Sequence, residues 1–221
     1  MLKALEVLTK RGSVERPLYR ALVRGLAEAG ELGAAPLITL ALSREDVGGL
    51  PTIAAAACLE APELSEPLAR IVTRGQAHLA FAAEMARVAR GQSNGLHLAG
   101  IAPKIKEAHR LDLCSELVVP LLHCERTLPP AIEPAMAVLR SAERHLGRWL
   151  VMAEIAVRAG SDAPWLEARQ QAQSGPESAR AAWQLLAWAL DRSGEPPPTV
   201  RPTVELVARL SDRPSAERDM T

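Results

Sequence analysis

Hydrophobic and polar residues recur along this chain with the period of an α-helix, in short segments separated by Gly or Pro. The first long segment, 15–29, places its apolar residues at the i, i+4, i+8 and i+11 positions of one helix face, at Leu18, Leu22, Leu26 and Ala29. Gly30 then ends the segment, and a second apolar run follows at 35–43. The pattern therefore predicts two short helices joined by a tight turn.

This two-helix unit recurs about every 30 to 34 residues, which indicates a helical repeat. A short helix over 2–10 precedes the repeats. The segment 91–100 is expected to be a loop that lengthens the third unit, because it is rich in Gly and Ser and contains Asn-Gly. New units are predicted to begin near Arg16, Val47, Gln76, Pro130 and Asp162, and a last short helix is predicted around 203–210.

The fold class predicted from these patterns is all-α. No segment shows the alternation of a strand, and aromatic residues, which favour strands, make up only 3% of the chain. We expect an α-solenoid of about five antiparallel helix pairs with capping end helices, folded as a single helical-repeat domain over 1–210. Residues 211–221 form a polar tail that we expect to be disordered.

The repeats resemble those of the HEAT family and the related armadillo-like folds. Residues 178–182 have the Arg-Ala-Ala type of a second helix, and first helices carry a proline near their start, at Pro17, Pro51, Pro134 and Pro164. The resemblance covers roughly 15–195 and implies a right-handed superhelix whose second helices line a groove for a protein partner. The chain lacks the regular Asp in the turn between helices and the repeated Val-Arg of typical HEAT repeats. A tetratricopeptide array, whose Trp…Leu-Gly…Tyr pattern is missing, and an irregular helical bundle are the structural alternatives.

Charge and motifs favour a binding protein over an enzyme. The chain has 26 basic and 26 acidic residues, whereas nucleic-acid-binding domains usually carry a basic excess. It contains no GxSxG, HExxH, P-loop or GxGxxG motif. The spacings of His109 with Cys114 and of His123 with Cys124 point each pair of side chains to different helix faces. We therefore expect no catalytic residues, no cofactor and no metal site.

Cysteine usage and hydropathy indicate a cytoplasmic protein that does not span a membrane. The three cysteines include no CxxC pair, so we expect reduced thiols. The longest uncharged stretch, 32–43, is shorter than the roughly 20 residues that a transmembrane helix needs.

Two ladders of arginine residues at i+4 spacing are candidate binding surfaces. The first comprises Arg16, Arg20 and Arg24. The second comprises Arg140, Arg144 and Arg148, interrupted by a turn expected at Gly147. Each ladder lies about 200° around its helix from the apolar residues, where any amphipathic helix places charges, so a solvated face is the simpler interpretation.

If both ladders face one groove, they would instead bind an acidic partner or phosphates. HEAT-like DNA glycosylases line a concave face with basic residues and Trp. The resemblance therefore implies an alternative function, a nucleic-acid-binding protein or DNA-repair enzyme that uses the arginine ladders.

Trp188 is the residue predicted to anchor a partner. Burial in the core is the default for the four tryptophans. Trp188 is the exception, because it shares a face with Gln184 and the main apolar stripe of its helix runs elsewhere, through Ala182, Leu185, Leu186 and Ala189. An exposed Trp often anchors an interface. We therefore predict a non-enzymatic protein–protein interaction scaffold, with a protein partner or a second copy of the chain meeting the surface around Trp188.

Overall fold

The chain is built from α-helices, as its hydrophobic pattern predicts. The computed structural model describes residues 1–11, 16–44, 49–118, 121, 127–143 and 145–191. Of these described residues, 81% are helical and none lies in a strand. None of the described helices is long and apolar enough to cross a membrane. The expected helix around 203–210 and the tail at 211–221 lie outside the described residues.

Residue contacts divide the chain into two compact units, Met1–Ser161 and Asp162–Thr221. The single domain expected over 1–210 stays a prediction. In the second unit, α12 (Ala163–Ser174) packs against α13 (Glu177–Asp191), and the two helices are separated by the short turn at Gly175.

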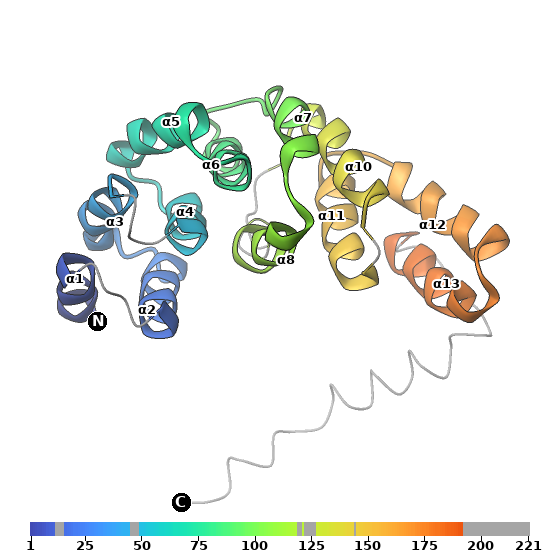
Figure 1. Ribbon diagram of the computed structural model, residues 1–221, viewed down its shortest axis with the longest axis horizontal. Helices are drawn as coiled ribbons and strands as arrows, with labels where there is room; N and C mark the ends of the chain where they lie inside the picture. The colour runs from blue at the N-terminus through green and yellow to red at the C-terminus, as the bar shows by residue number, and fades with distance from the viewer. Residues whose placement is uncertain (12–15, 45–48, 119–120, 122–126, 144, 192–221) are drawn as a thin grey trace, which may run out of the picture. The chain divides into compact units, whose positions relative to one another are not determined.

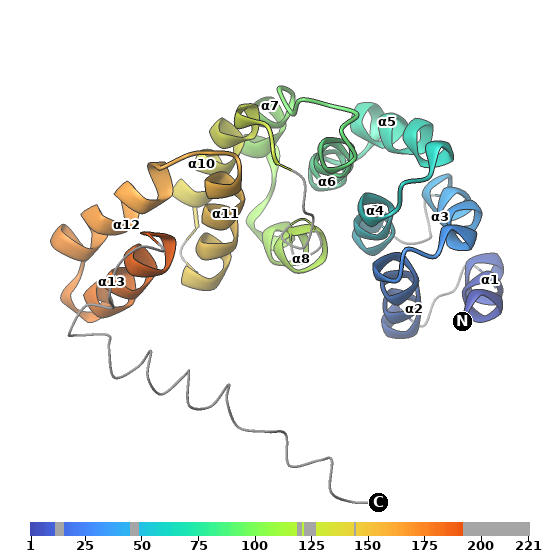
Figure 2. The ribbon, with the colours of Figure 1, turned by 180° about the vertical axis from the view of Figure 1, so that it is seen from behind.

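The first unit begins with six helices in two rows (Figures 1 and 2). Along one row α1 contacts α3 and α3 contacts α5, and along the other α2 contacts α4 and α4 contacts α6. The two rows are joined because α1 packs on α2, α3 on α4 and α5 on α6. These helices are α1 (Leu2–Arg11), α2 (Arg16–Glu28), α3 (Ala35–Leu42), α4 (Gly49–Cys58), α5 (Ser65–Arg74) and α6 (Ala77–Ala89).

The pairing of helices differs from the sequence-based prediction, which paired 15–29 with 35–43. The helix at 35–43 is α3, and it packs on α4 instead of forming the main contact of α2. A helix inside this arrangement packs on more than one other helix, as α3 packs on α1, α4 and α5. An apolar face on such a helix therefore does not reveal which neighbour is its partner.

The buried face of α2 also differs from the prediction. Of the predicted stripe, Leu26 is buried and Leu22 is partly buried, whereas Leu18 and Ala29 are exposed. Tyr19, Val23 and Ala27 complete the buried face. This buried face packs on α4, where the Tyr19 hydroxyl lies 2.9 Å from the Thr52 hydroxyl oxygen. Helix α6, by contrast, is buried nearly all round, as its apolar composition predicts.

The remainder of the first unit consists of short helical segments followed by two longer helices. Helix α10 contacts α7, α11 contacts the π-helix η5, and η5 also contacts α4 and α6. The predicted loop at 91–100 is correct for 91–97, but residues from Leu98 onward form α7. These elements are α7 (Leu98–Ile101), η3 (Ala102–Lys104), η4 (Glu107–His109), α8 (Arg110–Leu113), η5 (Cys114–Val118), η6 (Pro130–Ile132), α10 (Glu133–Ser141) and α11 (Leu146–Arg158).

Candidate functional site

A groove in the first unit lies between α2, α4 and η5, and we call it the α2–α4 groove. Small side chains form its floor, because α4 carries four consecutive alanines, of which Ala54 and Ala55 line the groove beside Ala27 of α2. The depression is small and shallow, because Ala54 and Ala55 are only 5% and 3% exposed. The groove is lined by Arg24, Ala27, Glu28, Pro51, Ala54, Ala55, Cys58 and Glu116.

Two ion pairs supply the charged groups of this groove. Arg24 Nε lies 2.7 Å from Glu28 Oε1, one helical turn along α2. Arg20 pairs with Glu116, which joins α2 to η5. The Glu116 side chain is only 5% exposed, whereas Arg20 is 48% exposed, so the arginine is the solvent-facing partner. Each arginine is balanced by one carboxylate, and the rim is therefore close to neutral.

Glu116 reaches the groove from a π-helix. Such segments are rare, occur mostly as single turns and are frequent at functional sites. Cys114 of the same segment is buried on another side, and burial, with the charge of Glu143 acting in the same direction, raises the pKa of its thiol to about 11. The thiol is consequently neutral near pH 7 and is not an activated nucleophile.

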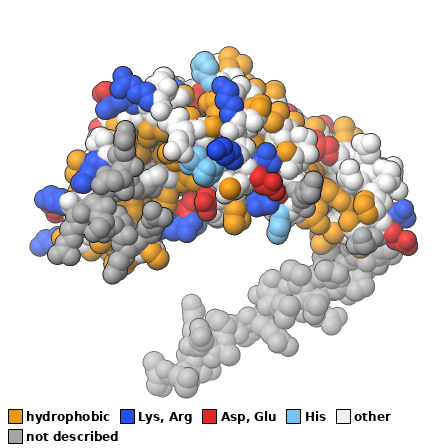
Figure 3. Space-filling model, viewed as in Figure 1, with side chains coloured by type: hydrophobic (Ala, Val, Ile, Leu, Met, Phe, Trp, Pro, Cys, Tyr) orange, Lys and Arg blue, Asp and Glu red, His pale blue; other side chains and the backbone are white. Residues whose placement is uncertain are grey.

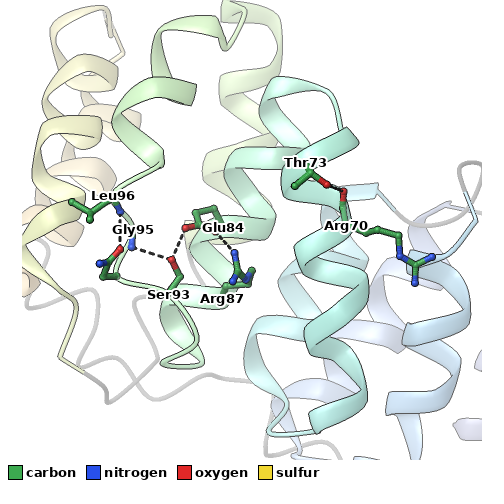
Figure 4. Close-up of polar contacts among 8 residues, drawn as sticks. Arg70, Thr73, Glu84, Arg87, Ser93, Gly95 and Leu96 are labelled. Carbon is green, nitrogen blue, oxygen red and sulfur yellow. Dashed lines mark hydrogen bonds and ion pairs between the residues drawn. The ribbon is translucent and has the colours of Figure 1, made fainter.

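The loop after α6 is held by a buried carboxylate, as Figure 4 shows. Glu84 is fully buried, and its Oε2 accepts a hydrogen bond from Arg87 Nη1 at 2.9 Å. Its Oε1 accepts a hydrogen bond from the Ser93 hydroxyl, and Ser93 Oγ in turn accepts one from the Gly95 N–H at 3.2 Å. These bonds satisfy the buried charge and fix the loop, which indicates a structural role for this Ser–Glu pair.

Two members of the first arginine ladder meet the α2–α4 groove. Arg24 lines it, and Arg20 pairs with its Glu116. The side chain of Arg16, at the start of α2, lies outside the described residues. Because the buried face of α2 includes Tyr19 and Val23, Arg20 and Arg24 flank the packed face instead of lying opposite to it.

The prediction of a second exposed ladder is wrong. Arg140 is 2% exposed, and its Nη2 lies 2.8 Å from Glu133 Oε1 within the same helix region. Arg148 belongs to a different helix and pairs with Glu143 at 2.8 Å. Helix α10 ends at Ser141 and α11 begins at Leu146, so helical spacing does not run from 140 to 148, and Gly147 lies inside α11. Arg144 lies outside the described residues.

Trp188 and Gln184 both lie on α13 and are partly buried. The buried residues of this helix are Leu186, Ala187 and Leu190. Of the predicted stripe, Leu186 is therefore buried, Ala182 and Leu185 are partly buried, and Ala189 is exposed. The role predicted for Trp188 as a partner anchor stays a prediction.

Other polar contacts escaped the sequence analysis because they join residues far apart in the chain. Arg90 donates to the carbonyl oxygens of Ala56, Leu59 and Ala61 at the end of α4, and burial lowers the pKa of its guanidinium. The rings of His78 and His109 stack with their centroids 4.0 Å apart. Neither the position of Arg90 just after α6 nor the spacing between His78 and His109 in the sequence indicates these contacts.

Positive and negative side chains lie close together over the middle of the face seen in Figure 3. This mixture does not resemble the single-sign surface that binds nucleic acid through its phosphates. Comparisons with models of known protein families, with curated proteins and with solved structures found no match to this chain.

Proposed function

We propose that this chain is a non-enzymatic protein–protein interaction scaffold of the HEAT-like solenoid type, acting in the cytoplasm. The observation that carries the proposal is the α2–α4 groove, which combines an alanine floor with charged residues at its edge. The row formed by α2, α4 and α6 supports it, because in a helical repeat the second helices are the ones that line the binding surface.

The proposed partner contributes an extended or helical segment that packs apolar atoms on Ala54 and Ala55 and polar atoms against Arg24. Because Ala54 and Ala55 are only 5% and 3% exposed, the apolar contact is small, and the charged rim sets the orientation of the segment and its rate of association. The nucleic-acid alternative receives less support, because Arg20, Arg24, Arg140 and Arg148 each pair with a glutamate.

The proposal is tested by Arg24→Glu with Arg70→Glu as the matched control. Arg70 pairs with Glu66 at i,i+4 on α5, as Arg24 pairs with Glu28 on α2, but it does not line the groove. Proteins that bind the wild-type chain in its source cells are identified by proximity labelling. We expect a specific partner to be lost from R24E and retained by R70E, with unchanged melting temperatures.

The groove itself is examined through Cys58, which lines it and is partly buried. The identified partner should slow alkylation of the Cys58 thiol, measured peptide by peptide with mass spectrometry. A partner that binds R24E as tightly as wild type and leaves Cys58 alkylation unchanged would exclude this groove. Binding to DNA that weakens steeply with salt would favour the nucleic-acid alternative.

A further inference from the structure

Two arginines meet beside one carboxylate at the junction of α8, α10 and α11. Arg110, the first residue of α8, donates from Nη1 to the carbonyl oxygen of Ala142 at 3.0 Å. Arg148, in the first turn of α11, donates from Nη2 to Glu143 Oε1 at 2.8 Å. Because Ala142 and Glu143 are consecutive residues, both guanidinium groups lie at the same short connection. We call Arg110 and Arg148 the arginine pair.

The buried thiol of Cys114 confirms that the two cations share one environment. Glu143, Arg148 and Arg110 all act electrostatically on this thiol. Since burial keeps Cys114 protonated, the thiol adds no negative charge near neutral pH. Among the described residues, the arginine pair thus carries two positive charges against the one carboxylate seen to contact it, whereas Arg20, Arg24 and Arg140 each pair with a glutamate.

The arginine pair also has N–H donors that lack a hydrogen-bond acceptor. The Nε–H groups of Arg110 and Arg148 are buried and have no acceptor. Glu143 Oε1 already accepts from both Arg148 and the backbone N–H of His145, each at 2.8 Å. An additional oxyanion from solvent would not reach the buried Nε–H groups, but at the exposed part of the Arg148 guanidinium it would balance the charge, because the planar fork matches carboxylate and phosphate oxygens.

The surroundings of the pair indicate which kind of molecule brings this oxyanion. The Arg148 side chain is 21% exposed, so part of its guanidinium is open to solvent. Leu111, the residue after Arg110, is 57% exposed and offers an apolar contact beside the cations. A peptide can supply an anionic and an apolar side chain together, whereas a nucleic-acid backbone presents only repeated phosphates next to the acidic residues of this surface.

We propose that Arg110 and Arg148 form an oxyanion-recognition site for a protein partner, which places a carboxylate or phosphorylated side chain on the arginine pair and an apolar residue on Leu111. The inference rests on the proposed scaffold function and specifies the chemistry of its partner. It adds a contact on the far side of η5 from the α2–α4 groove.

Fluorescence anisotropy of labelled peptides tests the site on the full chain. Three peptides share one sequence with an apolar residue beside a central position, which is glutamate, phosphoserine or glutamine. We expect the glutamate or phosphoserine peptide to bind at least about tenfold more tightly than the glutamine peptide, as charge-assisted hydrogen bonds would give. The tighter of the two identifies carboxylate or phosphate as the source.

Variants then assign the binding to the arginine pair. Arg110→Gln and Arg148→Gln should each weaken the anionic peptide about tenfold, Arg148→Lys should weaken it by less, and Arg70→Gln should leave it unchanged. Equal binding of the three peptides, or full binding by folded R110Q and R148Q, overturns the proposal. Because R148Q leaves the buried Glu143 carboxylate without its arginine and can unfold the chain, R110Q and R148K carry the test in that case.

A second readout separates this site from the proposed groove. The arginine Nε–Hε resonances of Arg110 and Arg148 should shift in NMR spectra on addition of the anionic peptide, and should not shift with the glutamine peptide. Arg24→Glu should retain the peptide. If R24E also retains every cellular partner while R110Q loses the peptide, the groove proposal fails and the oxyanion site stands. If the Nε–Hε signals do not move, the oxyanion site fails irrespective of the groove.

Discussion

Replacing Gly95 with alanine is expected to lower the free energy of unfolding by more than backbone strain alone would lower it. Gly95 has a φ of +76°, a left-handed conformation that costs an L-residue about 1–2 kcal/mol. A Cβ atom at this position would lie 2.8 Å from Ile132 Cγ2, 3.2 Å from Leu98 Cδ1 and 3.3 Å from Val88 Cγ2. Ile132 and Leu98 are fully buried, so relief of this contact requires movement of the core, at about 1–3 kcal/mol.

The total loss in the free energy of unfolding expected for Gly95→Ala is therefore about 2–5 kcal/mol. Two other glycines separate the contributions. Gly160→Ala has the same backbone requirement, at φ +81°, but its Cβ would meet nothing within 4 Å, so it should cost only about 1–2 kcal/mol. Gly100→Ala, inside α7 with open space around it, should be neutral or stabilising by up to about 1 kcal/mol.

Urea unfolding followed by circular dichroism at 222 nm measures the three variants under identical conditions. Gly95→Ala should be the most destabilised variant, followed by Gly160→Ala and then by Gly100→Ala. Equal losses for Gly95→Ala and Gly160→Ala would show that Ile132, Leu98 and Val88 do not enclose Gly95, and would refute the packing of the 91–97 loop on η6, α7 and α6.

Two further predictions concern the histidine stack and Trp188. Burial and the charge of His109 lower the pKa of His78 in the folded chain, so the unfolded chain binds a proton at this histidine first as the pH falls. The free energy of unfolding should therefore decrease as the pH falls below about 6.5. In urea unfolding at several pH values, His78→Gln should reduce this decrease, whereas replacement of the exposed His145 by Gln should not. Trp188→Ala should weaken partner binding or self-association with little change in melting temperature; a large drop in melting temperature with unchanged association would place Trp188 in the core, where truncation costs about 3–5 kcal/mol.

The helices themselves could be predicted from the sequence because each carries a local signal. Apolar composition identifies α6, and Gly30 and Gly75 mark the points where α2 and α5 end. Local signals fail where two helical faces are equally apolar. On α2, the leucines at 18 and 22 and the residues at 19 and 23 both follow an i, i+4 spacing, and which face is buried depends on the tertiary packing on α4, which includes the Tyr19–Thr52 contact.

The candidate site was predicted only where its residues share one helix, because the sequence signal is local. Arg20 and Arg24 lie on one continuous helix, so their spacing placed both on neighbouring turns of α2. The second ladder failed because the chain leaves the helix after Ser141 without Gly or Pro to mark the break. The arginine pair could not be foreseen, because Arg110 meets the α10–α11 connection only through tertiary contact over a separation of 32 residues.

The π-helix η5 contributes residues to both proposed contacts of the first unit. Glu116 pairs with Arg20 on one side of η5, whereas Cys114 lies among Arg110, Glu143 and Arg148 on the other. Residues two positions apart in a helical segment point to roughly opposite sides of it, so one short segment faces both places. Helix α4 supplies the floor of the groove beside η5, and α11 supplies Arg148 on its other side, and both helices contact η5 directly. The two proposed contacts therefore lie on opposite sides of η5, and a partner that meets both must place an apolar segment on one side and an anionic residue on the other.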